Sequence, residues 1–367
     1  MEVLVEKLRS LDPSERLFAT SRIRRKVCEA DSPPSQALVD LGVIPILLSF
    51  ISPDSPEDLQ YEACWALGNI GSGSTAQTQA LVDHGALGKL QALLASPSAN
   101  LRGTALLGLA NIAGDSPPLR DLVIASGAVP PVLALLGTDT SPAILHKCIW
   151  LLSNCCRGVP SVPWGVAADI LPTLIKLLHS EDPELLSYAA WSVQFLAEAH
   201  LQNVIATGIV PRMIDLVSAS PNFPLAVLRF LGIVFLDGTN QQTEMLLKSS
   251  LLTSLSHFLS SPKRPEITKE TCWIISNINA RDSNHIQQII DAHIMEYITI
   301  LYQNTSREIQ TEIVWALSNA ILCGSPAQVR FVVECGAFGP LCDVLGTENV
   351  QLLLFALRTL ESVLQVG

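Results

Sequence analysis

Glutamate, tryptophan and asparagine recur at one fixed spacing, Glu-x-x-Trp-x-x-x-Asn, in three stretches of the chain. The stretches are "YEACWALGNIG" from residue 61, "ETCWIISNINA" from residue 270 and "TEIVWALSNAI" from residue 311. A row of Asn carboxamides can pair with the N–H and C=O groups of an extended peptide. Indoles one repeat apart form slots for the methylene stem of Lys or Arg, and a carboxylate one turn away can receive the charged end. The spacing therefore predicts a surface that binds an extended, Lys/Arg-rich peptide.

The same stretches predict amphipathic helices in which these three side chains lie beside the buried stripe. At about 100° per residue, the apolar residues of the first helix share one sector of roughly 100°. They are Leu59, Ala63, Ala66, Leu67 and Ile70. A single Trp outside such a stripe is more often a packing residue, and a single Asn near a helix end is more often a cap. The joint recurrence of both favours a binding surface.

Composition and charge exclude several classes of protein. The chain has 367 residues, of which 49% are hydrophobic and 16% charged, so it is not intrinsically disordered. Its length predicts two or three domains or one repeat array. The formal net charge of −11 argues against nucleic acid as a direct partner and favours a basic partner. No apolar run reaches the roughly 18 to 20 residues of a membrane helix, so we expect no membrane association.

Residue types that support catalysis or metal binding form no recognised pattern. The nine cysteines include no C-x-x-C pair, and the seven histidines are scattered singly, so we expect no metal site. The stretch "GNIGSGST" resembles a phosphate-binding loop, but no strand precedes it and no Lys follows it. Because no catalytic triad or carboxylate pair is present either, we expect no cofactor and no enzymatic activity.

Two independent markers reveal an internal repeat. Trp65, Trp150, Trp191, Trp273 and Trp315 are separated by 85, 41, 82 and 42 residues, which are one or two multiples of about 42. A Gly-apolar-apolar-Pro pattern, with variations, keeps the same period: "GVIP" at 42, "GALG" at 85, "GAVP" at 127, "DILP" at 169, "GIVP" at 208 and "GAFGP" at 336. Periods of roughly 40 to 47 residues are typical of HEAT and armadillo arrays. Three predicted helices per repeat, with a Gly break after the first, favour armadillo.

We therefore predict an all-α fold, a right-handed armadillo-repeat superhelical solenoid of about eight to nine three-helix repeats. Repeats that bury their faces only on their neighbours stack into an array with a long concave surface. Residues 1–367 are expected to form a single armadillo-repeat domain. Within it, the first repeat (about 3–51) and the last, partial repeat (about 337–367) are expected to act as caps.

On these motifs the chain resembles the importin-α family of armadillo adaptors, which carry proteins with basic nuclear localisation signals. The most specific stretches are "ACWALGNIGSGSTAQTQALVD", "LANIAGDSPPLRDLVIASGAVPPVLALL", "HKCIWLLSNCCRG" and "KETCWIISNINARDSNHIQQII". The resemblance covers nearly the whole chain. It implies a nuclear import adaptor that binds the Lys/Arg-rich signals of cargo proteins as extended peptides and shuttles between cytoplasm and nucleus.

The resemblance also implies two signal-binding sites, assigned residue by residue. The larger site would use Trp65, Asn69, Ser72, Gly73, Thr78, Asn111, Asp115, Trp150, Asn154 and Trp191. Asp115 matches the family carboxylate that receives the key lysine. The smaller site would use Glu270, Trp273, Asn277, Glu312, Trp315 and Asn319.

Several repeats depart from the family pattern. Leu107 stands where the family has Trp, and Lys147 occupies a groove-facing position where it should repel a basic peptide. Repeat six lacks the Asn and keeps Arg229. The other departures are Gly103 and Thr104 in place of polar or acidic groups, Tyr188 in place of an acid and Phe195 in place of Asn. We therefore expect an eroded larger site and a complete smaller site.

The basic N-terminal arm through which the family binds importin-β is missing from this sequence, so we expect that this chain alone does not bind importin-β. The basic cluster "RIRRK" at 22–26 is expected to be a solvated helix face within the first repeat. One alternative function remains open, an armadillo scaffold or dedicated chaperone that holds one specific partner protein. The eroded repeats three to five favour it more than an intact groove would, and peptide-array binding distinguishes the two.

Overall fold

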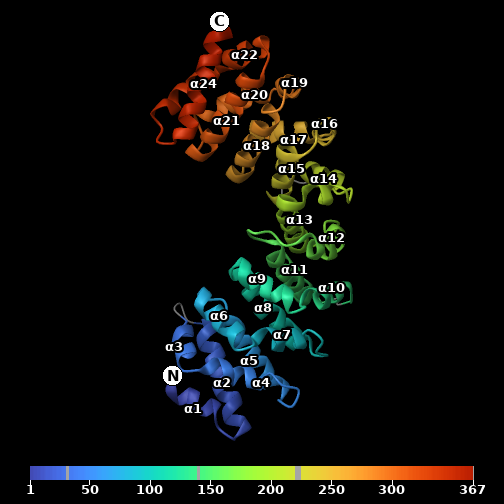
Figure 1. Ribbon diagram of the computed structural model, residues 1–367, viewed down its shortest axis with the longest axis vertical. Helices are drawn as coiled ribbons and strands as arrows, with labels where there is room; N and C mark the ends of the chain where they lie inside the picture. The colour runs from blue at the N-terminus through green and yellow to red at the C-terminus, as the bar shows by residue number, and fades with distance from the viewer. Residues whose placement is uncertain (30–32, 139–140, 220–224, 367) are drawn as a thin grey trace. The chain divides into compact units, whose positions relative to one another are not determined.

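The computed structural model describes residues 1–29, 33–138, 141–219 and 225–366, and these residues form helices joined by turns, without a β-strand (Figure 1). The all-α prediction is confirmed. The chain divides into two compact units, Met1–Leu196 and Ala197–Gly367, and each is described by itself. The expectation of one domain over the whole chain stays a prediction.

The first unit contains helices ordered so that, in most repeats, two short ones are followed by a longer third helix. They are α1 (Glu2–Leu8), α2 (Pro13–Glu29), α3 (Ser35–Asp40), α4 (Val43–Phe50), α5 (Glu57–Ile70), α6 (Thr75–Asp83), α7 (Ala86–Leu93), α8 (Ala99–Asp115), α9 (Pro117–Ala125), α10 (Val129–Thr138), α11 (Pro142–Cys156), α12 (Trp164–Leu177) and α13 (Pro183–Ile205), the last of which ends in the second unit. A non-helical residue, His200, interrupts α13.

The second unit repeats the same order of helices. It contains α14 (Val210–Ala219), α15 (Leu225–Asp237), α16 (Asn240–Leu247), α17 (Leu251–Ser260), α18 (Pro265–Asn279), α19 (Ser283–Asp291), α20 (Ile294–Tyr302), α21 (Arg307–Cys323), α22 (Pro326–Val332), the π-helical turn η1 (Val333–Ala337), α23 (Phe338–Asp343), the 3-10 turn η2 (Val344–Gly346) and α24 (Val350–Val366).

Residues with left-handed backbone mark the boundary between the first and second helices of a repeat. Five glycines of the described residues have positive φ there, with 68° at Gly42, 83° at Gly85, 80° at Gly127, 77° at Gly208 and 104° at Gly336. Glycine adopts this conformation without the Cβ penalty that other residues meet. His293 takes the equivalent place before α20, with φ 57°. At "DILP" no such break occurs, and α12 continues through Pro172.

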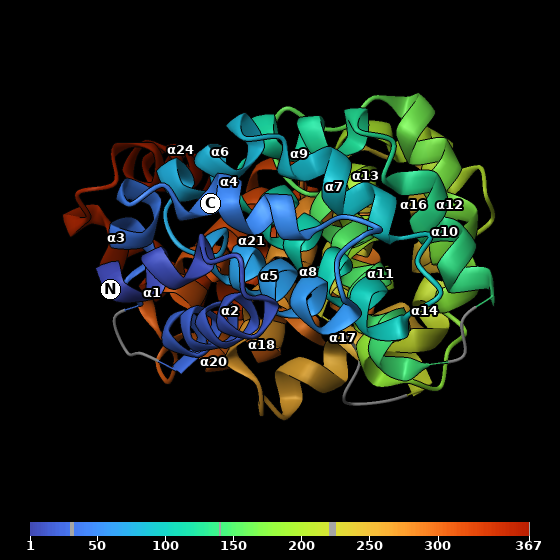
Figure 2. The ribbon, with the colours of Figure 1, turned by 90° about the horizontal axis from the view of Figure 1, so that it is seen from below.

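The third helices of successive repeats pack directly on one another and position the predicted sites. In the first unit α2, α5, α8 and α11 follow one another in this order (Figure 2), and in the second unit α15, α18, α21 and α24 do so. Glycines permit close approach, since a Cβ added to Gly68 would lie 3.6 Å from the Cα of Gly108. The predicted stripe is confirmed, because Leu59, Ala63, Ala66, Leu67 and Ile70 are at most 3% exposed.

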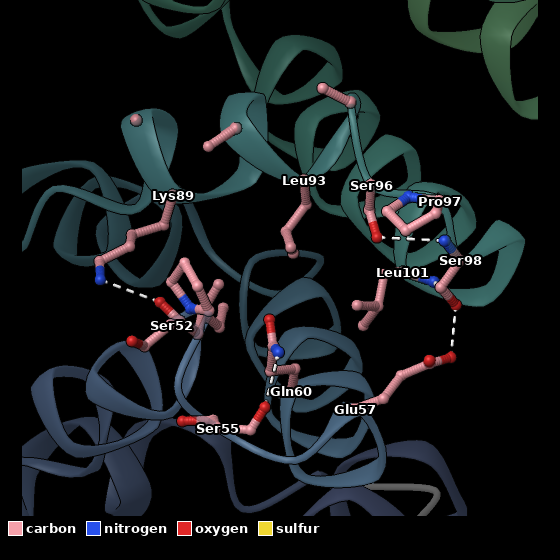
Figure 3. A pocket seen from close by; sticks show the side chains of 15 residues that line it. Ser52, Ser55, Glu57, Gln60, Lys89, Leu93, Ser96, Pro97, Ser98 and Leu101 are labelled. Atoms are coloured by element: carbon pink, nitrogen blue, oxygen red, sulfur yellow. Dashed lines mark hydrogen bonds between the residues drawn. The ribbon is translucent and has the colours of Figure 1, made fainter.

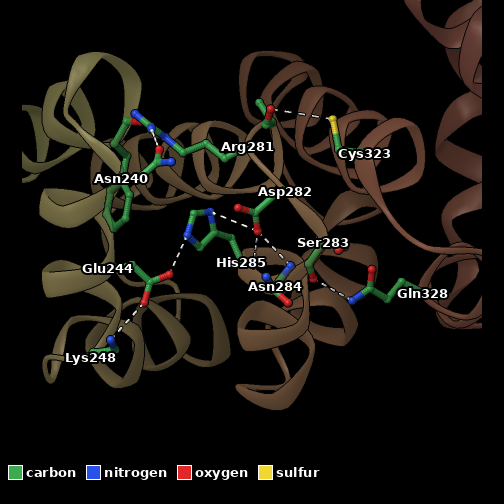
Figure 4. A network of polar contacts seen from close by, with 12 residues as sticks. Asn240, Glu244, Lys248, Arg281, Asp282, Ser283, Asn284, His285, Cys323 and Gln328 are labelled. Atoms are coloured by element: carbon green, nitrogen blue, oxygen red, sulfur yellow. Dashed lines mark hydrogen bonds and ion pairs between the residues drawn. The ribbon is translucent and has the colours of Figure 1, made fainter.

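Polar side chains also join neighbouring repeats, as Figure 4 shows for the second unit. The Nε2 atom of buried His285 on α19 lies 3.0 Å from Oε1 of Glu244 on α16. Gln328 of α22 donates from Nε2 to the main-chain carbonyl of Ser283, at 2.8 Å. Arg281 donates from Nη2 to the carbonyl of Phe235, at 2.6 Å. Such bonds satisfy groups at the repeat boundaries that would otherwise be buried without partners.

Among the described helices, none is by itself long and apolar enough to cross a membrane. The pair α9 and α10, bent by 74° at the break between them, passes this test of length and composition only as a pair.

Candidate functional site: the tryptophan and asparagine rows

The predicted Trp and Asn residues lie along one edge of each third helix. Trp65 and Asn69 on α5 are half-buried, whereas the three residues between them are buried. Trp150 and Asn154 on α11 show the same pattern. In the second unit, α18 and α21 repeat it. The prediction that these side chains stand beside the core stripe is therefore confirmed in both units.

Each Asn of the rows on α8, α11, α18 and α21 donates a hydrogen bond to the preceding repeat. The acceptors are main-chain carbonyls: Gly68 for Asn111 at 2.8 Å, Ala110 for Asn154 at 2.9 Å, Gly232 for Asn277 at 3.4 Å and Ser276 for Asn319 at 3.0 Å. Within the described part of the chain, no hydrogen bond reaches the Oδ1 atoms of these four residues. Each carboxamide thus links two repeats. Asn111, Asn154 and Asn277 keep one N–H and the oxygen that could pair with a peptide backbone, whereas Nδ2 of Asn319 also donates to Oγ of Ser276, at 3.1 Å.

The turn after α5 and the C-terminal parts of α8 and α11 line a pocket of about 300 Å³, called here the Asp115 pocket. It brings together Ser72, Gly73, Asn111, Asp115, Trp150 and Asn154 of the predicted larger site. One carboxylate oxygen of Asp115, Oδ2, is buried and has no hydrogen-bond partner among the described residues. Since an unpaired buried carboxylate oxygen is costly, this pocket favours a cationic group from a ligand.

The other predicted residues of the larger site lie outside the Asp115 pocket. Thr78 is fully buried, and its Oγ1 lies 3.0 Å from the carbonyl oxygen of Gly71 and 3.3 Å from Oδ1 of Asp115. Its hydroxyl can therefore orient Asp115 but cannot touch a peptide. Trp191 stacks on Phe195, with ring centroids 5.7 Å apart. Asn69 is close to Cys28, at 2.6 Å from Nδ2 to Sγ.

Trp65 lines a second pocket, of about 190 Å³, between the N-terminal parts of the same three helices. This pocket, called here the Lys147 slot, also contains Tyr61, Gly103, Thr104, Leu107 and Lys147. The Nζ atom of Lys147 lies 3.1 Å from the position that a Cβ on Gly103 would occupy. An ammonium group of the chain itself therefore stands beside the space between Trp65 and Leu107. The predicted groove-facing position of Lys147 is confirmed.

Arg24 is a residue of this face that the sequence analysis missed. Its guanidinium carbon lies 4.7 Å from the centroid of the Trp65 ring, and its Nε donates to the carboxylate of Glu62. The expectation of a solvated face for "RIRRK" is wrong for Arg24, whose side chain is only 17% exposed. Arg24 precedes Trp65 by 41 residues, about one repeat, and so occupies the Trp position of the first repeat. The repeat period is the signal that could have found it.

Positive charge therefore accompanies the carboxylates of this face. Arg157 lines the Asp115 pocket and donates from Nη2 to the carbonyl of Gly114, at 3.1 Å. Together with Arg24 and Lys147 it places three cations beside two carboxylates, Glu62 and Asp115. The face is less acidic than the net charge of the whole chain suggests.

The six predicted residues of the smaller site lie on α18 and α21. Several of their side chains already contact residues of neighbouring repeats. Glu270 is 9% exposed and accepts a hydrogen bond from Nε of Arg229, at 2.8 Å. The Trp273 ring covers Gly232, because a Cβ there would lie 2.1 Å from Cζ3. Trp315 packs on Phe355, with centroids 4.5 Å apart.

The remaining carboxylate of the smaller site, Glu312, lies in a partly buried position on α21. Burial raises the pKa of Glu312. The positive charge of Lys269 lowers this pKa to a smaller extent, and the negative charge of Glu270 raises it further. The carboxylate is thus less readily ionised than an exposed one. A peptide cation placed beside it would favour the ionised form.

A larger cavity, of about 610 Å³, lies between the turns before α5 and α8 (Figure 3). It shares no residue with the Asp115 pocket or the Lys147 slot. Its polar groups bond to one another, as Lys89 donates to the carbonyl of Ile51 at 2.9 Å and Gln60 to that of Ser55 at 2.9 Å. Because these groups already have partners, this cavity offers less chemistry for recognition than the Trp and Asn rows.

Comparisons with known proteins agree with this architecture. The family model of the armadillo/β-catenin-like repeat matches residues 31–72, 116–157 and 160–195. Importin subunit alpha-1b of Oryza sativa subsp. japonica is 35% identical, over 100% of this chain and 69% of the relative. Importin subunit alpha-5 of Arabidopsis thaliana is 38% identical, over 97% of this chain and 69% of the relative. The crystal structure of an engineered protein has the same fold, with a TM-score of 0.72 at 23% identity over 100% of this chain and 99% of that one.

Proposed function

Because this chain belongs to the importin-α family of armadillo proteins, we propose that it is a nuclear import adaptor that binds Lys/Arg-rich nuclear localisation signals as extended peptides. Members of this family are transport adaptors and not enzymes. Under this proposal the partners are cargo proteins that carry basic signals. The protein would accompany them between cytoplasm and nucleus.

The observation that supports the proposal most directly is the unpaired oxygen of Asp115. Oδ2 of this carboxylate is buried in a pocket that also contains the indole of Trp150 and the carboxamides of Asn111 and Asn154. A lysine side chain suits both the carboxylate and the indole, because its ammonium can donate to Oδ2 while its methylene stem lies against the indole. The two carboxamides can hold the peptide main chain on either side.

Isothermal titration calorimetry with a lysine-rich peptide tests the proposal. Asp115→Asn keeps the shape of the pocket and removes its charge, so we expect affinity there to fall about tenfold or more, as for a lost charge-assisted hydrogen bond. Asp169→Asn removes the same charge at an exposed position of α12 and serves as the control. Equal affinities of wild type and Asp115→Asn would contradict the assignment of this pocket.

The smaller site has its own test. Trp273→Ala combined with Asn277→Ala removes one slot wall and one carboxamide, and we expect a loss of about 2 to 4 kcal/mol of binding free energy there. Both residues also contact Gly232 of the preceding repeat, so the urea midpoint of the variant must be measured beside its affinity. A folded variant with unchanged affinity would contradict the assignment of the smaller site.

A scaffold or dedicated chaperone for one partner protein is the second candidate. The cations Arg24, Lys147 and Arg157 on the face of the larger site favour it, because they oppose a uniformly basic ligand. A peptide array distinguishes the two functions. Binding of many unrelated basic peptides supports the adaptor, and binding of a single non-basic sequence supports the chaperone.

A further inference from the structure

We infer that the larger site selects a peptide of mixed charge, with a basic side chain in the Asp115 pocket and an acidic side chain, Asp or Glu, in the Lys147 slot. This inference rests on the proposed function, because it specifies which peptide the site takes. It departs from the expectation of a uniformly basic ligand. It concerns only the first unit.

The Lys147 slot has the chemistry to accept an acidic group. The Nζ atom of Lys147 has no hydrogen bond or ion pair with any described residue, and Gly103 beneath it has no side chain. The carboxylate of Glu62, which could have balanced the charge, is bonded to Arg24. A peptide lysine entering this slot would meet a like charge, whereas a carboxylate would gain a charge-assisted hydrogen bond.

The walls of the Lys147 slot also do not favour a cation. Leu107 replaces one of the two indoles that would flank a lysine stem, and it has no ring quadrupole to attract a cation. The other indole, Trp65, already has the guanidinium of Arg24 at 4.7 Å from its centroid. The Oγ1 atom of Thr104 lies 3.1 Å from the carbonyl of Asn100, so its hydroxyl is used within α8. Arg24 does not itself line the slot, but the slot has one indole wall in place of two, and its threonine hydroxyl is already bonded.

The two pockets lie at different levels along the third helices. On α8, the lining residues of the Asp115 pocket fall within 110–115 and those of the Lys147 slot within 99–107, so Asn111 of the pocket and Leu107 of the slot are one turn apart. Successive side chains of an extended peptide point to opposite sides. A peptide whose main chain follows the Asn row therefore places residues of opposite parity in the two pockets. The acidic and basic residues are expected to be neighbours or three positions apart.

A charge-swap experiment tests this pairing. The probes are a lysine-rich peptide and a series in which each lysine in turn is replaced by glutamate, with affinities from fluorescence anisotropy. At the peptide position that enters the Lys147 slot, we expect the wild-type protein to bind the glutamate-substituted peptide at least as tightly as the unsubstituted lysine-rich peptide. Lys147→Glu should reverse this preference. At that position only, the ratio of the affinities for the glutamate and lysine peptides should change about threefold to fivefold, as for a partly exposed ion pair worth roughly 1 kcal/mol. Lys176→Glu, on the exposed side of α12, makes the same charge change outside the site and is the control.

The outcomes separate this inference from the proposed function. If basic peptides bind but Lys147→Glu and Lys176→Glu shift all peptides alike, the slot has no charge preference and the inference is wrong. If no basic peptide binds the wild type at all, the proposed function itself fails. Measurements in the background of Trp273→Ala with Asn277→Ala remove the contribution of the smaller site. If that background is unfolded, the same comparison in the wild-type background still decides, because only the position-specific reversal counts.

Discussion

The guanidinium carbon of Arg24 lies 4.7 Å from the centroid of the Trp65 ring, and the two residues belong to third helices of successive repeats. The Nε atom of Arg24 also donates to Glu62, one turn before Trp65. A side chain of the protein thus makes both contacts, with indole and carboxylate, that a peptide arginine would make in such a slot. A cation of the chain itself therefore occupies the place beside Trp65 and Glu62.

Arg24→Ala is expected to destabilise the protein. The substitution leaves the carboxylate of Glu62, whose side chain is 16% exposed, without its partner, at a cost of about 1 to 3 kcal/mol. Urea unfolding measures the loss. Arg25→Ala, on the exposed face of the same helix, is the matched control and should change the midpoint little. A further substitution, Glu62→Gln, should restore part of the stability, and failure to do so would show that the ion pair is not the cause.

Gly232→Ala is expected to displace the indole of Trp273. The new Cβ would lie 2.1 Å from Cζ3 and 2.8 Å from Cε3, which is closer than any van der Waals contact, so the ring must move. Such overpacking costs about 1 to 3 kcal/mol, and tryptophan fluorescence should change with it. Gly339→Ala is the control, since no atom of the described residues lies within 4 Å of its added Cβ. Identical unfolding midpoints for the two variants would contradict this contact.

Glu312→Gln is expected to raise stability at pH 7 and to weaken binding of basic peptides at the smaller site. Burial raises the pKa of Glu312, so the folded state disfavours its ionised form, and a neutral side chain of the same shape avoids that cost. The advantage of the variant should shrink as the pH falls through the raised pKa, because Glu312 is then protonated as well. Glu308→Gln is the contrasting control, since the hydrogen bond from Lys269 lowers the pKa of Glu308. A Glu312→Gln variant less stable than wild type at pH 7 would contradict the prediction.

Asp182→Asn is expected to lower stability at pH 7 but not in acid. A hydrogen bond from His146, at 2.7 Å from Nε2 to Oδ2, is the main cause that holds the pKa of Asp182 below its ordinary value of 3.8. A carboxyl whose pKa is lowered by folding contributes stability above its unfolded pKa and loses it as the pH falls through the folded value. The difference between wild type and variant in urea midpoint should therefore shrink as the pH falls past 3.8, the ordinary pKa of this group, and through its lowered value in the folded state. Asn still caps α13, so the variant isolates the charge.

The exposed carboxylate Asp169 supplies the control for this comparison, because Asp169→Asn makes the same substitution at a residue that forms no ion pair with the described residues. A stability difference between wild type and Asp182→Asn that stays constant down to pH 3 would show that the pair with His146 does not depend on the charge of Asp182.

Helical periodicity and the repeat length were enough to predict most of the architecture. The apolar stripe of α5 and the half-buried places of Trp65 and Asn69 follow from the 3.6-residue period, which is a local property of the chain. The left-handed glycines before second helices follow from residue type, because glycine has no Cβ. At "DILP" the same pattern lacked its glycine, and the helix continued.

Contacts across one repeat were decided only by the tertiary structure. Arg24 and Trp65, or Gly103 and Lys147, are about 40 residues apart, and only the packing of third helices brings them together. The same packing buries Thr78 behind Asp115 and leaves Oδ2 of that carboxylate without a hydrogen-bond partner among the described residues. The sequence therefore determined which residues of each third helix lie on the edge that carries the Trp and Asn rows, because helical geometry sets the direction of each side chain. Which charges meet there depends on the distances between neighbouring helices, and a repeat pattern does not contain those distances.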